Sequence, residues 1–220
     1  MPTSASSSLS SSPSSSPTSR GDPSCAGRRT SVAELPDLED AWLVIIDAQR
    51  IFADASSEWG SPMFDAALPQ MKSLRSGFGA DRTILTRWLP GTDREGSWGA
   101  YFERWPFADR PTTDPLFDLV GPAAGWSTRG TVDRTTFGKW GETLTRVTGD
   151  RPTLVLAGVS TDCCVISTAL PAVDAGATVV VAADACAGSS EDDHAAALRV
   201  MGLYAPQIVV ADSAEVLAAR

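Results

Sequence analysis

The chain has 220 residues, of which 43% are hydrophobic and 20% charged, and its formal net charge is -9. This length and balance are ordinary for one compact domain with a hydrophobic core. The negative charge argues against nucleic acid or an anionic membrane as a main partner, because both need basic surfaces. The four cysteines are too few for a secreted disulfide scaffold, so we expect reduced thiols and a cytoplasmic protein.

The first 30 residues differ in composition from the rest, because serine and proline dominate them. Such a segment cannot bury enough apolar surface to offset the entropy lost on ordering, so we expect residues 1–30 to be a disordered tail. It holds no apolar segment of the kind that a secretory signal requires. We therefore place a single domain over residues 31–220.

Short apolar runs alternate with segments of helical period along that domain. The runs predict strands covered on both faces, at Trp42–Ile46, Arg82–Trp88, Thr153–Val159, Thr178–Ala183 and Gln207–Ala211. The segments between them predict helices at Phe64–Ser76, Gly138–Thr148, Asp162–Ala175, Ser190–Leu203 and Ser213–Ala219. The alternation predicts an α/β fold: a single-domain, three-layer αβα sandwich with a mostly parallel sheet of about six strands. Ligands bind such sheets at the carboxyl ends of the strands.

Two polar features follow strands directly. Asp47 comes after the first apolar run, as either a functional carboxylate or a loop or helix cap. The stretch "GVSTDCCV" follows a later run and places Cys163 and Cys164 in the first turn of a helix. The amides and dipole of a helix N-terminus stabilise a thiolate, although both cysteines could equally be small buried hydrophobes.

Several ordered segments resemble the isochorismatase-like cysteine hydrolases, which include nicotinamidases and N-carbamoylsarcosine amidases. They are "VIIDAQRIF", "TVDRTTFGKW", "GVSTDCCVISTAL" and "GATVVVAADACAGSSEDDHAAAL", within a resemblance that covers most of Trp42 to Leu217. Four motifs in this order are specific for the fold and much less specific for a substrate. The resemblance implies an isochorismatase-like α/β fold and a homo-oligomer.

The register of the nucleophile motif selects Cys164 over Cys163. Adjacent helical residues point about 100° apart, so both thiols cannot face one pocket equally. We expect Cys163 to face sideways or into packing.

The third catalytic group of the family is a lysine, and here Arg134 stands at the position that the resemblance assigns to it. Arginine keeps the positive charge of lysine but not its shape or proton chemistry. Lys139 follows five positions later in the sequence. It could reach the pocket, but the resemblance does not place it there, and we expect a solvent-facing helix residue. The resemblance thus implies the catalytic residues Asp47, Arg134 and Cys164.

The family mechanism implies that Asp47 takes the proton of Cys164 and that the thiolate attacks a carbonyl carbon. The backbone N–H groups of Ser160 and Cys164 would form the oxyanion hole. In the family the peptide bond equivalent to Val159–Ser160 is often cis, which would aim the Ser160 N–H inward.

We expect Gln49, Phe52, Trp88 and Phe137 to shape the substrate pocket, although Gln49 could equally hold the loop backbone. The stretch Thr86–Pro106 is rich in tryptophan, glycine and proline and should loop over the strand ends. Its aromatic residues could line the pocket or anchor the loop.

We expect neither a metal nor another cofactor. The zinc-dependent nicotinamidases use histidines near the first loop, whereas the single histidine here, His194, lies in a late helix, where a surface role is the simpler interpretation. Nicotinamidase is therefore disfavoured as the specific activity.

The leading hypothesis is an amidohydrolase: a cysteine hydrolase acting on a small amide, ureido or related carbonyl compound. The alternative is a non-catalytic relative that binds a small molecule or a protein, because Arg134 replaces the family lysine. A third, a redox sensor using Cys163 and Cys164, is weaker because no resolving cysteine has evident spacing.

Overall fold

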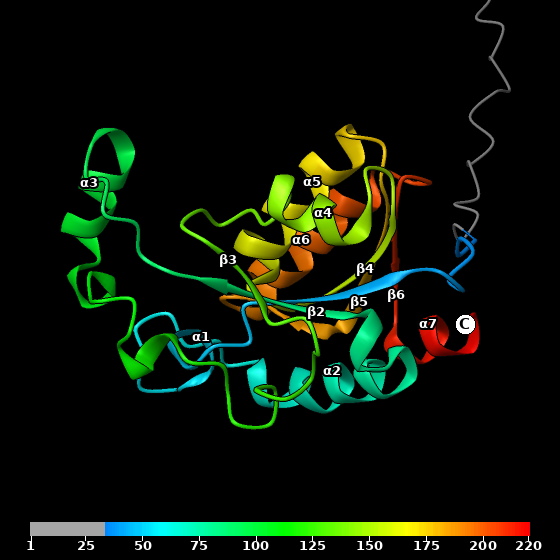
Figure 1. The fold of residues 1–220 in the computed structure, drawn as a ribbon, viewed down its shortest axis with the longest axis horizontal. Coiled ribbons are helices and arrows are strands. Elements are labelled where there is room, and N and C mark those ends of the chain that lie inside the picture. The colour runs from blue at the N-terminus through cyan, green and yellow to red at the C-terminus, as the bar shows by residue number, and fades with distance from the viewer. Residues whose placement is uncertain (1–33) are drawn as a thin grey trace, which may run out of the picture. The chain divides into compact units, whose positions relative to one another are not determined.

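A computed structural model describes residues 34–220 of the chain (Figure 1). The predicted disordered tail, residues 1–30, lies outside the described residues, as does Cys25. No helix within residues 34–220 combines the length and the apolar character that a bilayer crossing would need.

The centre of the fold is a six-stranded, wholly parallel sheet in the order β3-β2-β1-β4-β5-β6. Its strands are β1 (Trp42–Ile46), β2 (Thr83–Trp88), β3 (Thr131–Arg134), β4 (Thr153–Val159), β5 (Thr178–Ala187) and β6 (Ile208–Ala211). The predicted α/β sandwich is confirmed. Sequence reasoning missed β3 because it is a short edge strand in which only Val132 is buried, so it lacks the continuous apolar run of a central strand.

Helices cover both faces of the sheet, with α4, α5 and α6 on one side and α2 and α7 on the other (Figure 1). The helices are α1 (Arg50–Ala53), α2 (Phe64–Phe78), α3 (Gly96–Arg104), α4 (Glu142–Thr148), α5 (Ile166–Asp174), α6 (Glu191–Gly202) and α7 (Ser213–Ala218). The stretch predicted as a loop over the strand ends contains α3. The helix predicted from Gly138 begins only at Glu142, so the residues before it are free to enter the site.

Alternate residues of the central strands face two separate cores. Leu43 and Ile45 of β1 pack into the core that includes α2, whereas Val44 and Ile46 pack into the core that includes α5. Both faces of β1 are therefore fully buried. Burial on both faces explains why the central strands have continuous apolar sequences.

The site lies where β1 and β4 come unusually close. A Cβ atom added to Gly158 would stand 2.1 Å from the carbonyl oxygen of Ile46, and the φ of Gly158 is 111°, so glycine is required here. The pairing of β4 with β5 also shifts register between Leu156 and Gly158. Irregularities of this kind re-aim the end of a strand.

Candidate active site

A cavity of about 490 Å³ opens at the carboxyl ends of β1 and β4. Its walls combine aromatic rings with the nucleophile motif: Phe52, Glu58, Trp59, Gly60, Tyr101, Trp105, Phe137, Ser160, Asp162, Cys163, Cys164 and Ser189. The position agrees with the general rule for parallel α/β sheets.

Asp47 follows β1 and is completely buried. Its backbone has a φ of 47°, which is uncommon for a residue with a side chain and costs free energy. Two hydrogen bonds hold it: its N–H donates to Thr86 Oγ1 at 3.1 Å, and the Thr86 hydroxyl donates to Asp47 Oδ1 at 2.6 Å. Thr86 on β2 therefore fixes the orientation of the carboxylate and leaves Oδ2 for other partners.

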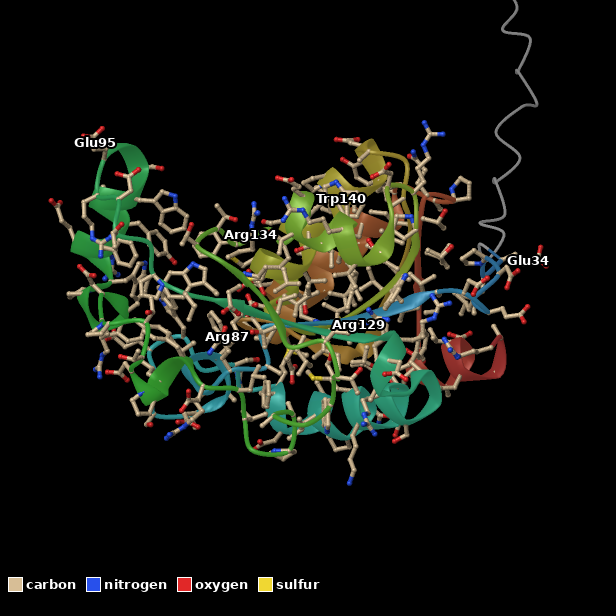
Figure 2. All side chains as sticks on the ribbon, in the orientation of Figure 1. Glu34, Arg87, Glu95, Arg129, Arg134 and Trp140 are labelled. Atoms are coloured by element: carbon tan, nitrogen blue, oxygen red, sulfur yellow. The ribbon has the colours of Figure 1, made fainter. Side chains whose placement is uncertain are left out.

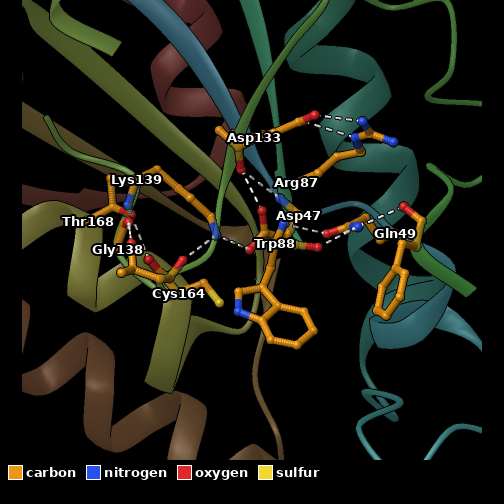
Figure 3. A network of polar contacts seen from close by, with 12 residues as sticks. Asp47, Gln49, Arg87, Trp88, Asp133, Gly138, Lys139, Cys164 and Thr168 are labelled. Carbon is orange, nitrogen blue, oxygen red and sulfur yellow. Dashed lines mark hydrogen bonds and ion pairs between the residues drawn. The ribbon is translucent and has the colours of Figure 1, made fainter. Parts of the chain in front are cut away.

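The partner of Oδ2 is Lys139, whose Nζ lies 2.9 Å away (Figure 3). Both side chains are 0% exposed. Lys139 Nζ also donates to the Thr136 carbonyl oxygen at 3.0 Å. The expectation that Lys139 faces solvent is wrong: a buried ammonium needs an opposite charge and hydrogen-bond acceptors, and Asp47 and Thr136 supply both.

The loop before α4 carries Lys139 into the site by packing closely against α5. A Cβ atom at Gly138 would stand 2.4 Å from the Ser167 carbonyl oxygen, so only glycine allows this approach. The N–H of Lys139 then donates to Thr168 Oγ1 at 2.9 Å, and the Thr168 hydroxyl donates to the Cys164 carbonyl oxygen at 2.7 Å. One buried hydroxyl thus links the backbone of the lysine to that of the candidate nucleophile.

Arg134 takes no part in this network. Its guanidinium packs against Gly141, and among residues 34–220 it forms no ion pair. In Figure 2 it lies, with Trp140, on the α4 side of the sheet. The assignment of Arg134 as the cation beside Asp47 is therefore corrected to Lys139. The sequence register was misleading because Arg134 is the last residue of an edge strand, and the chain turns into the site only after it.

Cys164 lies in a π-helical turn, Thr161–Val165, that joins β4 to α5. It is 1% exposed, yet it lines the cavity floor together with Cys163. We expected Cys163 to face sideways or into packing: it does pack against the core that includes α5, but it also lines the cavity. A π turn contains more residues than an α turn, so neighbouring side chains diverge less and both thiols reach the same cavity.

The two thiols perturb each other. The hydrogen bond with Cys163 raises the pKa of Cys164, and burial and the Asp47 carboxylate raise it further. The Lys139 ammonium opposes this rise. The same hydrogen bond lowers the pKa of Cys163. These effects together favour the neutral thiol at Cys164, so forming the thiolate there requires a base.

The predicted oxyanion hole has its residues in place at the cavity. Ser160 and Cys164 both line it, and the peptide bond between Val159 and Ser160 is cis. The hydrogen bonds of the turn run from the N–H groups of Cys163 and Val165 to the Ser160 carbonyl oxygen. Within residues 34–220, neither the Ser160 N–H nor the Cys164 N–H donates a hydrogen bond of this turn type or a hydrogen bond to a side chain.

The residues predicted to shape the pocket divide into two groups. Phe52 and Phe137 line the cavity. Gln49 instead joins the loop to β2: it donates to the carbonyl oxygens of Trp88 and Phe117 at 3.0 and 2.7 Å and accepts from the Trp88 N–H at 2.8 Å. Trp88 is fully buried behind the cavity wall.

Sequence reasoning missed Trp59 and Glu58, which lie between α1 and α2. The Trp59 ring packs against the rings of Tyr101 and Trp105, with centroids 5.7 and 5.9 Å apart. The signal that could have found it is a tryptophan a few residues after the motif that contains Asp47.

His194 of α6 is linked to the nucleophile turn, because its Nδ1 shares a hydrogen bond of 2.8 Å with the Thr161 hydroxyl. Burial lowers the pKa of His194, so the imidazole is more readily neutral than a free one. His194 is therefore less exposed than we expected for a residue with a simple surface role. Within the described part of the chain, no three histidine, cysteine or acidic side chains cluster in a way that could hold a metal ion.

Comparisons with known proteins agree with this fold. The family model described as "Isochorismatase domain" matches residues 41–215. A cysteine hydrolase from Pseudomonas syringae pv. phaseolicola 1448A has a similar structure, with a TM-score of 0.71 at 16% identity over 87% of this chain and 97% of that one.

Two further solved structures share the fold. An isochorismatase-like hydrolase from Alkaliphilus metalliredigens has a TM-score of 0.64 at 17% identity, over 82% of this chain and 97% of its own. A nicotinamidase from Bacillus subtilis has a TM-score of 0.62 at 20% identity, over 79% of this chain and 99% of its own. No curated protein matches the chain. The family model covers most of the described residues, and the chain belongs to the isochorismatase domain family of hydrolases.

Proposed function

We propose that the chain is a cysteine hydrolase that cleaves a small amide, ureido or related carbonyl substrate through a thioester intermediate. The observation that carries the proposal is the fully buried ion pair of Asp47 and Lys139 close to Cys164, which itself lines the cavity (Figure 3). A buried pair of this kind contributes little net stability, because the cost of desolvating both ions offsets their attraction. A functional role explains it better than a structural one.

In the first step Asp47 acts as the general base. Its Oδ2 carries the ion pair with Lys139 but no aligned hydrogen bond from residues 34–220, so a lone pair remains for the thiol proton. The proton passes from Cys164 Sγ to Asp47, and the sulfur attacks the carbonyl carbon of the substrate. Lys139 stabilises the thiolate electrostatically as it forms.

The attack turns the carbonyl oxygen into an oxyanion, for which the N–H groups of Ser160 and Cys164 are the candidate donors. Such donors contribute roughly 3–4 kcal/mol each to transition-state stabilisation. When the C–N bond breaks, the proton held by Asp47 goes to the leaving nitrogen and an acyl thioester stays on Cys164.

Water then hydrolyses the thioester. Asp47 takes a proton from the attacking water, the C–S bond breaks, and Cys164 regains a proton while the carboxylic acid leaves. One carboxylate thus serves as base, acid and base again, and Lys139 holds it in place throughout.

The alternative of a non-catalytic binding protein rested on the replacement of the family lysine by Arg134. Lys139 supplies a buried cation from a different position in the sequence, so that reason no longer favours the alternative.

The proposal is tested by screening the purified protein against a panel of small amides and ureido compounds for release of ammonia or amine. The matched controls are Cys164→Ala, which removes the nucleophile, and Cys186→Ala, which removes a buried thiol outside the cavity lining. We expect turnover of at least one compound that Cys164→Ala abolishes and Cys186→Ala retains. Turnover that survives in Cys164→Ala would refute the thioester route.

A further inference from the structure

Outside the turn that carries Cys164, the cavity lining is mainly aromatic, and we call this part the aromatic wall. Five of the twelve lining residues are aromatic: Phe52, Trp59, Tyr101, Trp105 and Phe137. The charged lining residues are Glu58 and Asp162, both acidic, and no lining residue is basic. We propose that the cavity selects substrates that carry a positively charged ammonium group close to the scissile carbonyl, an inference that rests on the proposed hydrolase function.

The rings form a wall of differently tilted faces around Trp59. Trp59 is tilted by 45° to Tyr101 and by 69° to Trp105, and Tyr101 is tilted by 67° to Phe137. Rings set at such angles turn their π faces in different directions around the cavity that they line. A cation within about 6 Å of an aromatic face is attracted by the ring quadrupole, by ~0.5–2 kcal/mol for each good contact.

One ring of the aromatic wall already stacks with a side-chain cation that does not line the cavity. The Arg104 guanidinium lies 4.5 Å from the centroid of the Trp105 ring, and Arg104 does not line the cavity. Among the residues that line the cavity, none supplies a cation to these rings. The nearby ammonium of Lys139 is paired with Asp47, so it does not offset the negative charge of the wall.

Glu58 is the carboxylate available to a ligand. It is exposed, lines the cavity, and within residues 34–220 has neither an ion pair nor a side-chain hydrogen bond. Its loop is held in place, because the Ser57 hydroxyl donates to the Ile51 carbonyl oxygen at 2.6 Å and the Gly60 N–H donates to the Ser57 carbonyl oxygen at 2.9 Å.

Asp162, in the turn that carries Cys164, adds a second negative charge to the cavity lining. Its carboxylate accepts hydrogen bonds from the Ser189 N–H at 2.8 Å and the Ser189 hydroxyl at 2.7 Å, which hold it at the cavity. Two carboxylates attract a cationic substrate and repel an anionic one. They also repel the carboxylate product of hydrolysis, which favours its release.

A matched pair of probes separates charge from shape. Choline and 3,3-dimethylbutan-1-ol have nearly the same size, but only choline is charged. Their binding is measured by calorimetry on the full-length Cys164→Ala protein, so that the result does not depend on whether the chain hydrolyses anything. We expect choline to bind at least about fivefold more tightly, the size of one or two cation–π contacts.

Two variants test which residues cause the preference for choline over the neutral alcohol. Glu58→Gln and Trp105→Leu should each bring the two affinities at least about twofold closer, by removing a charge or a π face. Glu103→Gln, on the exposed face of α3, should leave the ratio unchanged. Equal affinities in the parent protein, tighter binding of the neutral alcohol, or no binding of either probe would overturn the proposal. Hydrolysis in the amide screen would then still support the proposed function.

Discussion

Two aspartate–cation pairs stand near neighbouring strand ends, and they differ in burial. Arg87 and Asp133 face each other across β2 and β3 with side chains 26% and 36% exposed, and two hydrogen bonds of 3.0 and 2.6 Å join them. Asp47 and Lys139 are joined at 2.9 Å and are completely buried. The exposed pair has the better geometry, yet its position lets water solvate both ions.

The comparison shows that environment, more than geometry, decides what a pair can do. In water-exposed surroundings an ion pair contributes about 0–1 kcal/mol and is screened by salt. In a buried site the same attraction is much stronger, and so is the cost of leaving either ion alone. A buried pair can therefore hold a base in place for catalysis, whereas an exposed pair mainly fastens two strands.

Breaking the buried pair should have the largest effect. Lys139→Met leaves the Asp47 carboxylate buried without its cation, so we expect the free energy of unfolding to fall by about 3–5 kcal/mol. Hydrolytic kcat/KM should fall by roughly 10²–10⁴-fold, the usual contribution of a positioned acid–base group. Urea denaturation and steady-state kinetics measure the two effects.

The double variant Asp47→Asn/Lys139→Met separates stability from activity. It removes both charges, so much of the lost stability should return while activity stays absent. If the double variant is as unstable as the sum of the single variants, Asp47 and Lys139 are not energetically coupled as the structure implies.

Removing the hydroxyl that links the lysine to the nucleophile should have the next largest effect. Thr168→Val keeps the shape of the side chain but leaves the Lys139 N–H and the Cys164 carbonyl oxygen without this partner. We expect a loss of about 1–3 kcal/mol in urea denaturation, as for buried unsatisfied groups. The matched control is Thr145→Val, whose exposed hydroxyl bonds only the Glu142 carbonyl oxygen. An equal loss in both variants would contradict the special role of Thr168.

Removing the Cys163 thiol should have a smaller effect, which is a change in the pKa of Cys164. The hydrogen bond with Cys163 raises the pKa of Cys164, so Cys163→Ala should lower it and shift the alkylation of Cys164 to lower pH. Rates of iodoacetamide labelling, measured against pH and assigned by fragment-ion mass spectrometry, report the shift. Cys186 is an internal reference, because burial raises its pKa to about 12 and it does not line the cavity. A shift of Cys164 to higher pH would show that the two thiols interact in the opposite sense.

Breaking the exposed ion pair of Arg87 and Asp133 should have the smallest effect on stability. Arg87→Met should cost about 0–1 kcal/mol, and the loss should shrink at high salt. Burial raises the pKa of Asp133, but the hydrogen bond from Arg87 outweighs this together with the neighbouring charges and holds that pKa below its ordinary value. The stability that the ion pair contributes at neutral pH is therefore lost as the pH falls through the lowered pKa of Asp133. Denaturation of wild type and variant at several pH values measures this. A cost near that of Lys139→Met would invalidate the contrast between the two pairs.

The fold and the positions of Asp47 and Cys164 at the strand ends were predictable from sequence because they depend on local signals, whereas the choice of Cys164 over Cys163 came from the resemblance to the family. The apolar runs of β1 and β4 are continuous, and Asp47 and Cys164 follow those runs within a few residues. The cation was not predictable in this way. Its position depends on a close contact between Gly138 and the backbone of α5, and nothing in the local pattern around Lys139 reveals that contact.

The cavity wall was predicted only in part. Phe52 and Phe137 were expected at the pocket and the aromatic residues of Thr86–Pro106 were expected either there or as loop anchors, whereas Trp59 was not expected. Trp59 comes from the segment between α1 and α2, and Tyr101 and Trp105 come from α3 and the residue after it, so the wall exists only once the chain has folded. Aromatic residues in such segments are as often anchors as pocket walls, and Trp88, which was expected at the pocket, is such an anchor.

The assignment of Lys139 as the cation beside Cys164 is tested most directly in an Asp47→Asn background. Removing the carboxylate should shift the labelling of Cys164 to lower pH, because Asp47 raises the pKa of that thiol and Lys139 lowers it. Adding Lys139→Met should move the profile back to higher pH, whereas adding Arg134→Met should leave it in place. A profile that responds to Arg134→Met and not to Lys139→Met would contradict the assignment.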